Sequence, residues 1–168
     1  MSILDWGPLS RIRRNHGLEH ATLRILAQRN PAYRMAGYSD TQGFWMLGAV
    51  PTEEVRSACQ EALLRMAAGE HSLAVHSNCG TNYAAAGVVA GSVAWLAMLG
   101  ADSDWRKRLD RWPVLITLIT VALILAQPLG PFLQAHVTTD GHPRGMRIHS
   151  IQRQTRGEMP VHRVLTNG

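Results

Sequence analysis

The chain has 168 residues, of which 46% are hydrophobic, and its formal net charge is +5. This length allows one compact core of modest size. No nucleic-acid-binding motif accompanies the positive charge, and only 6% of the residues are aromatic. We therefore exclude nucleic acid as the expected partner and expect the arginines to lie near anionic lipid headgroups. The two cysteines stand in unlike settings and do not indicate a disulfide.

The most informative stretch is His16-Gly17-Leu18-Glu19-His20. We predict a helix over residues 15–28, with Asn15 as its N-cap. Positions i, i+3 and i+4 of a helix lie about 5–6 Å apart at Cβ, so two imidazoles at this spacing could bind one metal ion. The H-x-x-E-H order is also that of the inverzincin metallopeptidases, in which the carboxylate activates a metal-bound water.

The position of Glu19 on this helix supports a functional site. A helical projection places Glu19 inside the wide apolar arc, whereas Gly17 falls on the narrow polar strip. A carboxylate in apolar surroundings is costly unless it is paired, hydrogen-bonded or close to a metal. The alternative is a buried Glu–His hydrogen-bonding cluster that only ties the helix to its neighbours.

A hairpin and a second helix are predicted next. Residues 33–39 and 43–50 favour a β-hairpin, and a helix is expected to begin at Pro51 with Thr52 as its N-cap. Apolar residues on that helix recur at helical spacing and predict a core-facing stripe: Val55, Ala58, Cys59, Ala62, Leu63 and Met66. We interpret Cys59 as a core residue rather than a ligand.

A second cluster of candidate ligands follows. Residues 71–76 predict a short strand, in which alternation would turn His71 and His76 to opposite sides. His76 and Cys79 are three residues apart across a turn, a spacing that lets an imidazole and a thiolate chelate one ion. The alternative for Cys79 is an ordinary loop cysteine at a membrane boundary.

Two apolar runs, residues 83–101 and 112–139, carry no formal charge. The first is long enough to cross a bilayer core about 30 Å thick, and the second has its apolar heart in residues 113–126. The short link between them, residues 102–111, implies an antiparallel transmembrane helical hairpin. A hydrophobic hairpin buried in a soluble oligomer is the alternative.

Small residues mark one face of the first run, including Gly87 and Gly91 in a G-x-x-x-G pattern. Small side chains let two helices approach closely. We expect this face to pack on the second run or on another copy of the chain, which would give a homo-oligomer.

The end of the chain, residues 145–155 and 159–166, predicts a second β-hairpin that could join the first in one mixed sheet. Four histidines in this part have no chelating spacing and are expected at the surface: His136, His142, His149 and His162.

These elements predict an α+β fold in three parts. A small soluble helix/β-hairpin domain with the metal site covers residues 1–82, a transmembrane helical hairpin covers 83–132, and a C-terminal β-hairpin tail packing on the soluble domain covers 133–168. The lipid bilayer is then a partner, and the protein is a two-span protein of the cell membrane. Two signals for the orientation disagree. The basic residues of the turn between the runs favour a cytoplasmic turn. The lack of a recognised signal peptide favours cytoplasmic soluble parts instead, and we expect this second orientation.

The pairing of RRNHGLEHATL with LAVHSNCGTN ahead of two apolar runs resembles an uncharacterised family of small bacterial two-span membrane proteins, a domain of unknown function. A related uncharacterised multispan family is similar in the same H-G-x-E-H and H-x-x-C-G-T motifs. The resemblance covers about residues 10–140. It implies that His16, Glu19, His20, His76 and Cys79 form one site, and it implies no reaction. The inverzincins match only the five-residue helix motif, since their further glutamate ligand has no clear counterpart here.

Three functions fit these patterns. In the first, His16, His20 and either His76 or Cys79 hold Zn²⁺ or a similar ion, and an open position on the ion holds water. Glu19 takes the proton of this water during hydrolysis of an amide or ester at the membrane face, as in a peptidase. In the second, all four ligands close the shell, Glu19 orients them, and the protein is a metal-stapled scaffold or assembly factor. In the third, no metal is bound and a membrane anchor presents an interaction domain.

Overall fold

The structure, a computed structural model, describes residues 3–100, 105–157 and 159–168. It divides into two compact units. The first unit comprises residues up to His76 and from Gln134 to Gly168, and the second comprises Ser77–Leu133. Of the turn expected at 102–111, residues 102–104 lie outside the described residues.

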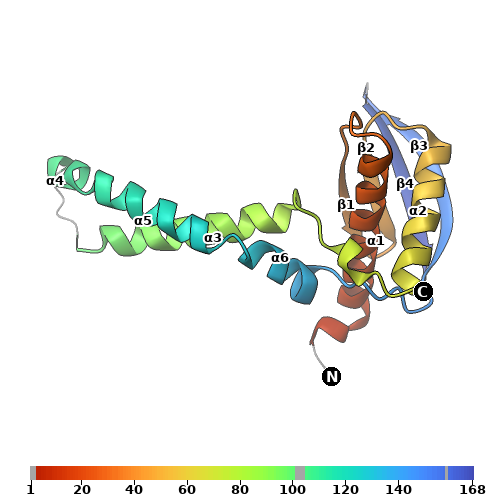
Figure 1. The fold of residues 1–168 in the computed structure, drawn as a ribbon, viewed down its shortest axis with the longest axis horizontal. Coiled ribbons are helices and arrows are strands. Elements are labelled where there is room, and N and C mark those ends of the chain that lie inside the picture. The colour runs from red at the N-terminus through yellow and green to blue at the C-terminus, as the bar shows by residue number, and fades with distance from the viewer. Residues whose placement is uncertain (1–2, 101–104, 158) are drawn as a thin grey trace. The chain divides into compact units, whose positions relative to one another are not determined.

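The first unit begins with a 3-10 helix, η1 (Ile3–Asp5), and a long helix, α1 (Gly7–Arg29) (Figure 1). The predicted start at Asn15 is wrong, because Pro8 already supplies the fixed φ that suits a first helical turn. Asn15 lies inside α1 and is buried. Its Nδ2 donates to the Asp40 carbonyl at 2.8 Å and its Oδ1 accepts from Thr166 Oγ1 at 2.6 Å, so it ties α1 to two strands.

Four described strands form one antiparallel sheet in the order β1-β2-β4-β3. The strands are β1 (Ala36–Asp40), β2 (Gly43–Leu47), β3 (Arg147–Arg156) and β4 (Met159–Asn167). Both predicted hairpins are confirmed, as β1/β2 and β3/β4, but the sheet is antiparallel throughout rather than mixed. Because β4 lies beside β2, the end of the chain completes the core, and the paired residues Phe44 and Val164 are both fully buried.

The second long helix of this unit, α2 (Thr52–Ala67), packs against α1 and β3. The predicted stripe is confirmed, with all members buried except Leu63, which is partly buried. Cys59 is a core residue, as predicted. The N-cap is Pro51 rather than Thr52, and the Thr52 hydroxyl instead bonds with Nε2 of His162 at 3.1 Å.

The strand predicted at residues 71–76 is wrong. The chain forms a 3-10 helix there, η2 (His71–Ala74). Leu73 and Ala74 are consecutive and both buried, whereas a strand would turn consecutive side chains to opposite faces. Burial of this apolar pair against α1 outweighs the weak alternation of a short segment.

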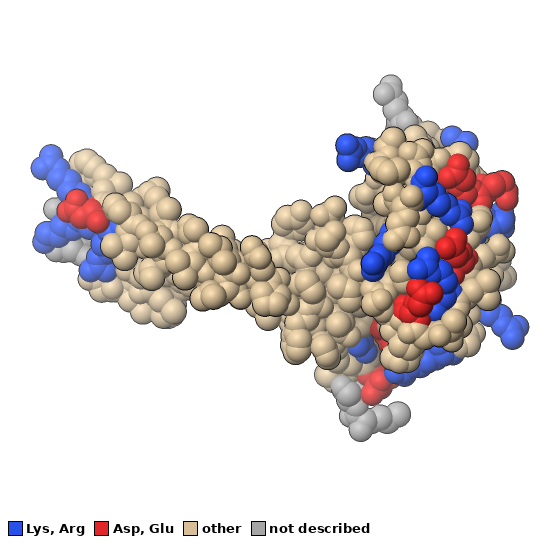
Figure 2. All heavy atoms as spheres, in the orientation of Figure 1, with Lys and Arg blue, Asp and Glu red and all other residues tan. Residues whose placement is uncertain are grey.

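The second unit is built from helices: α3 (Gly80–Met98), α4 (Trp105–Asp110), α5 (Trp112–Leu125) and α6 (Leu129–Leu133). The helices α3 and α5 pack side by side (Figure 1). Arg111 joins them at one end, because its guanidinium donates to the carbonyls of Ala97 and Leu99. The face of α3 and α5 that Figure 2 shows carries no charged side chain, whereas α4 carries three basic residues and one acidic residue.

The predicted fold class is wrong in its transmembrane helical hairpin. No single helix among the described residues is both long and apolar enough to cross a membrane. Trp105–Leu125 and Leu129–Thr138 meet the criteria of length and composition only when taken together, and they are bent by 48° at the break. The helix α3 opens with polar residues and is rich in glycine and alanine, whereas α5 is strongly apolar but has only 14 residues. The observed architecture consists of an α+β unit and a helical unit.

The face of α3 that carries the small residues Gly87 and Gly91 does not pack on α5. Gly87 and Gly91 are exposed, and a Cβ added at either would meet no described atom within 4 Å. Contact of this face with a second copy of the chain stays a prediction.

Candidate metal centre

The site rests on the middle of α1. Glu19 and His20 are 3% and 2% exposed, and His16 is partly buried. Gly17 is buried as well, so its placement on a polar strip was wrong. A Cβ at Gly17 would collide with the carbonyl oxygen of Asp140. The absence of a side chain at Gly17 therefore lets the backbone at Asp140 pack directly on α1.

Backbone carbonyls orient the two histidines of α1. Nδ1 of His20 lies 2.8 Å from the carbonyl oxygen of Ala74, and Nδ1 of His16 lies 3.0 Å from that of Thr138. A carbonyl oxygen can only accept, so Nδ1 carries the proton in both rings. Nε2 is then the nitrogen with the lone pair. Metal-binding histidines commonly show this arrangement, in which a carbonyl or carboxylate holds the second ring nitrogen.

Three imidazoles of the first unit lie close together. The ring centroids of His16 and His20 are 4.2 Å apart with an angle of 63° between the planes, and those of His20 and His76 are 5.6 Å apart at 41°. The backbone of His76 is held by the side chain of Gln134, whose Oε1 accepts from His76 N at 2.8 Å. Gln134 thus helps to hold His76, the third imidazole, next to His20 of the helix motif.

The Glu19 carboxylate lies between α1 and β1. Its Oε2 accepts a hydrogen bond from the Ser39 hydroxyl at 2.5 Å. Gly37, also on β1, makes room for it, since a Cβ there would lie 2.5 Å from Glu19 Oε1. The buried carboxylate therefore has a hydrogen-bonding partner, as the sequence argument required.

Cys79 lies in the second unit and is the N-cap of α3, where its Sγ accepts from the Thr81 amide at 3.5 Å. By donor type, His16, His20 and Cys79 form a set that could hold a metal ion. The place of Cys79 beside the imidazoles stays a prediction from its spacing to His76.

Sequence reasoning missed the groups that position the site. The carbonyls of Ala74 and Thr138 leave no side-chain signal. Gly37 did leave one, because an isolated glycine in a strand indicates close approach of another group. Among the remaining histidines, His136, His142 and His149 are exposed as predicted. His162 is buried, so its surface assignment was wrong.

The fold and the site together define an α+β protein whose longest described helix carries a buried carboxylate and two histidines, with a third histidine packed close to them. The chain belongs to the family described as domain of unknown function DUF6391, which it matches over residues 11–151. It is also similar to an uncharacterised protein of Picosynechococcus sp., with 34% identity over 156 residues that cover 86% of this chain and 73% of the relative. No solved structure matches the chain. An uncharacterised family was predicted and is confirmed at that level.

Proposed function

We propose that the protein binds Zn²⁺ or a similar transition-metal ion through His16 and His20. The observation that carries this proposal is the pair of Nδ1–carbonyl hydrogen bonds, which fixes both rings in the tautomer whose Nε2 can bind a metal. Imidazole nitrogens suit Zn²⁺ and its neighbours among the transition metals. His76 in the first unit and Cys79, three residues further along the chain, are the proposed remaining ligands.

Hydrolysis of an amide or ester is the first use that we propose for this centre. A bound Zn²⁺ would supply Lewis-acid chemistry and lower the pKa of a bound water. Glu19 would take the proton of the attacking water and pass it to the leaving group. Its place between the two histidines in the helix motif supports this role.

A structural centre is the second candidate, and the surroundings of Glu19 favour it. The carboxylate is 3% exposed and accepts from Ser39, a setting suited to orienting neighbouring groups. If all four ligands bind, the shell is closed and the protein is a metal-stapled scaffold.

Metal content of the purified full chain tests the proposal. We expect about one equivalent of zinc in the wild type and none in His16→Ala/His20→Ala. The matched control is His136→Ala/His149→Ala, which removes two exposed histidines and should retain the metal. Equal zinc content in both double variants would refute the proposal.

Glu19→Gln separates the two uses. The amide keeps the size of the side chain but cannot act as a base. Retained zinc with lost hydrolysis of chromogenic ester and amide substrates supports catalysis. Retained zinc without any zinc-dependent hydrolysis in the wild type supports the structural centre.

A further inference from the structure

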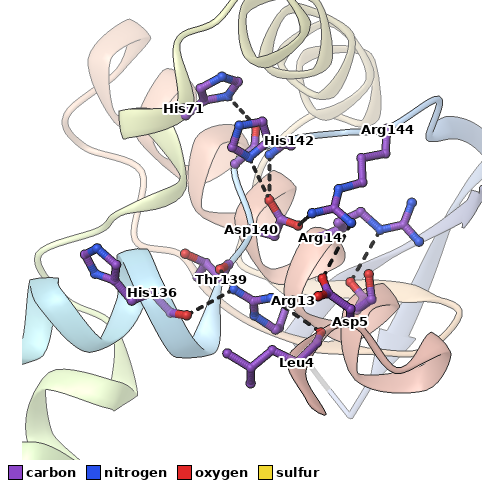
Figure 3. A network of polar contacts seen from close by, with 12 residues as sticks. Leu4, Asp5, Arg13, Arg14, His71, His136, Thr139, Asp140, His142 and Arg144 are labelled. Carbon is purple, nitrogen blue, oxygen red and sulfur yellow. Dashed lines mark hydrogen bonds and ion pairs between the residues drawn. The ribbon is translucent and has the colours of Figure 1, made fainter. Parts of the chain in front are cut away.

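A second pair of histidines lies on the first unit, away from the α1 motif. The rings of His71 and His142 are stacked with centroids 3.9 Å apart and 29° between their planes (Figure 3). Each ring has its Nδ1 on an oxygen acceptor. Nδ1 of His71 lies 2.9 Å from the Gly141 carbonyl, and Nδ1 of His142 lies 3.0 Å from Asp140 Oδ1. The proposed metal centre does not use either histidine.

The two segments joined by this stack are the same two segments that orient His16 and His20. η2 begins with His71 and ends with Ala74, whose carbonyl holds His20. The segment with His142 begins at Thr138, whose carbonyl holds His16. The stack therefore fastens one positioning carbonyl to the other.

Both segments are attached to α1. The Ala74 carbonyl of η2 contacts His20. In the other segment, the Asp140 amide donates to the Arg13 carbonyl at 2.9 Å, and the Arg13 guanidinium donates to the carbonyls of His136 and Thr139 (Figure 3). Between the two segments themselves, Gly141 allows the close approach, because a Cβ there would lie 2.7 Å from the His71 carbonyl oxygen. The contact between His71 and His142 thus connects the two segments that pack against the helix motif.

We propose that His71 and His142 are positioning residues of the metal centre, which act through the Ala74 and Thr138 carbonyls. The proposal rests on the proposed metal-binding function. The stacked rings, each with its Nδ1 on an oxygen acceptor, hold the two carbonyls in place.

Zinc affinity of the full chain at neutral pH tests the proposal. His71→Ala/His142→Ala should weaken binding about tenfold or more at neutral pH, the size found for groups that orient metal ligands. His71→Asn/His142→Asn should restore affinity, since the asparagine amide can replace the Nδ1–H donor. His149→Asn, at an exposed position, is the control.

A second readout needs no metal. Long-range ¹H–¹⁵N spectra of the imidazoles report which nitrogen carries the proton, and in the metal-free wild type we expect Nδ1–H for His16 and His20. In the alanine variant we expect a mixture of tautomers. Unchanged tautomers together with unchanged zinc affinity would overturn the proposal, as would equal losses of affinity in the alanine and asparagine variants. If the tautomers respond but the wild type binds no zinc, the positioning role stands and the metal-binding function fails.

Discussion

Ser39 Oγ donates to Glu19 Oε2 at 2.5 Å and joins α1 to the edge strand β1. Glu19 lies on α1 together with His16 and His20. The contact that gives the buried carboxylate its hydrogen bond therefore also holds this helix against the sheet. A hydrogen bond to an ionised group contributes more to stability than a neutral one.

Ser39→Ala should lower the free energy of unfolding by about 1–3 kcal/mol, because it removes a donor from a buried acceptor. Urea unfolding followed by far-UV circular dichroism measures the change. Ser57→Ala, on the exposed side of α2, should change stability by less than about 0.5 kcal/mol. Equal stability of the two variants would show that the Glu19 contact contributes nothing.

Gly37→Ala should destabilise the protein by about 1–3 kcal/mol, since the added methyl would overlap Glu19 Oε1 and the Trp45 carbonyl. The variant should also reduce zinc affinity, because Glu19 must move. Gly7→Ala is the control: a Cβ there meets nothing within 4 Å, and alanine favours the helix. The same urea midpoints for both variants would contradict the packing described for β1.

His162 should make the protein less stable in mild acid. Burial lowers the pKa of His162, and nearby Arg153 lowers it further. Above the ordinary histidine pKa of about 6.5, neither state is protonated and nothing is lost. As the pH falls below that value, the unfolded chain takes up a proton that the folded protein resists, so the free energy of unfolding falls until the lowered pKa is reached.

The test compares urea midpoints at about pH 7.5 and about pH 5.5 in the wild type and in His162→Gln. Glutamine can keep the bond to Thr52 but does not titrate, so its loss of stability between the two pH values should be smaller. The exposed His149→Gln should behave like the wild type. A loss in His162→Gln as large as that of the wild type would refute the assignment.

Cys59 should not react with alkylating reagents in the folded protein. Burial raises the pKa of its thiol to about 12, and the thiolate is the nucleophile. In a Cys79→Ser chain, iodoacetamide should label Cys59 in urea and leave it unlabelled in native buffer, as mass spectrometry would show. Rapid labelling in native buffer would contradict the placement of Cys59 in the core.

Periodic patterns in the sequence predicted the first unit well where each element buries one face. The stripe on α2 and the alternation in both hairpins follow directly from which side chains face the core. The positioning carbonyls of Ala74 and Thr138 could not be predicted, because any residue carries a carbonyl and only tertiary packing brings these two to α1. The contact between His71 and His142 could not be predicted for the same reason, since the two residues are 71 positions apart in the sequence.

The transmembrane prediction failed for a different reason. It counted uncharged residues along the chain, and the helices that form there divide those residues into segments. Pro128 and Gly130 fall after α5 has ended, so the second run is not one helix. The helix α3 begins at Gly80, before the first run, so it includes the polar residues Thr81 and Asn82, and it ends at Met98, before the run does. Helix boundaries, not the absence of charge, decide this point.

The zinc K-edge absorption spectrum of the full chain tests the central claim most directly. We predict at least two imidazoles at about 2.0–2.1 Å and one sulfur at about 2.3 Å. The sulfur should vanish in Cys79→Ser, and imidazole scattering should fall in His16→Ala/His20→Ala. A zinc shell of oxygen atoms alone, identical in the wild type and both variants, would contradict a metal centre built on His16 and His20.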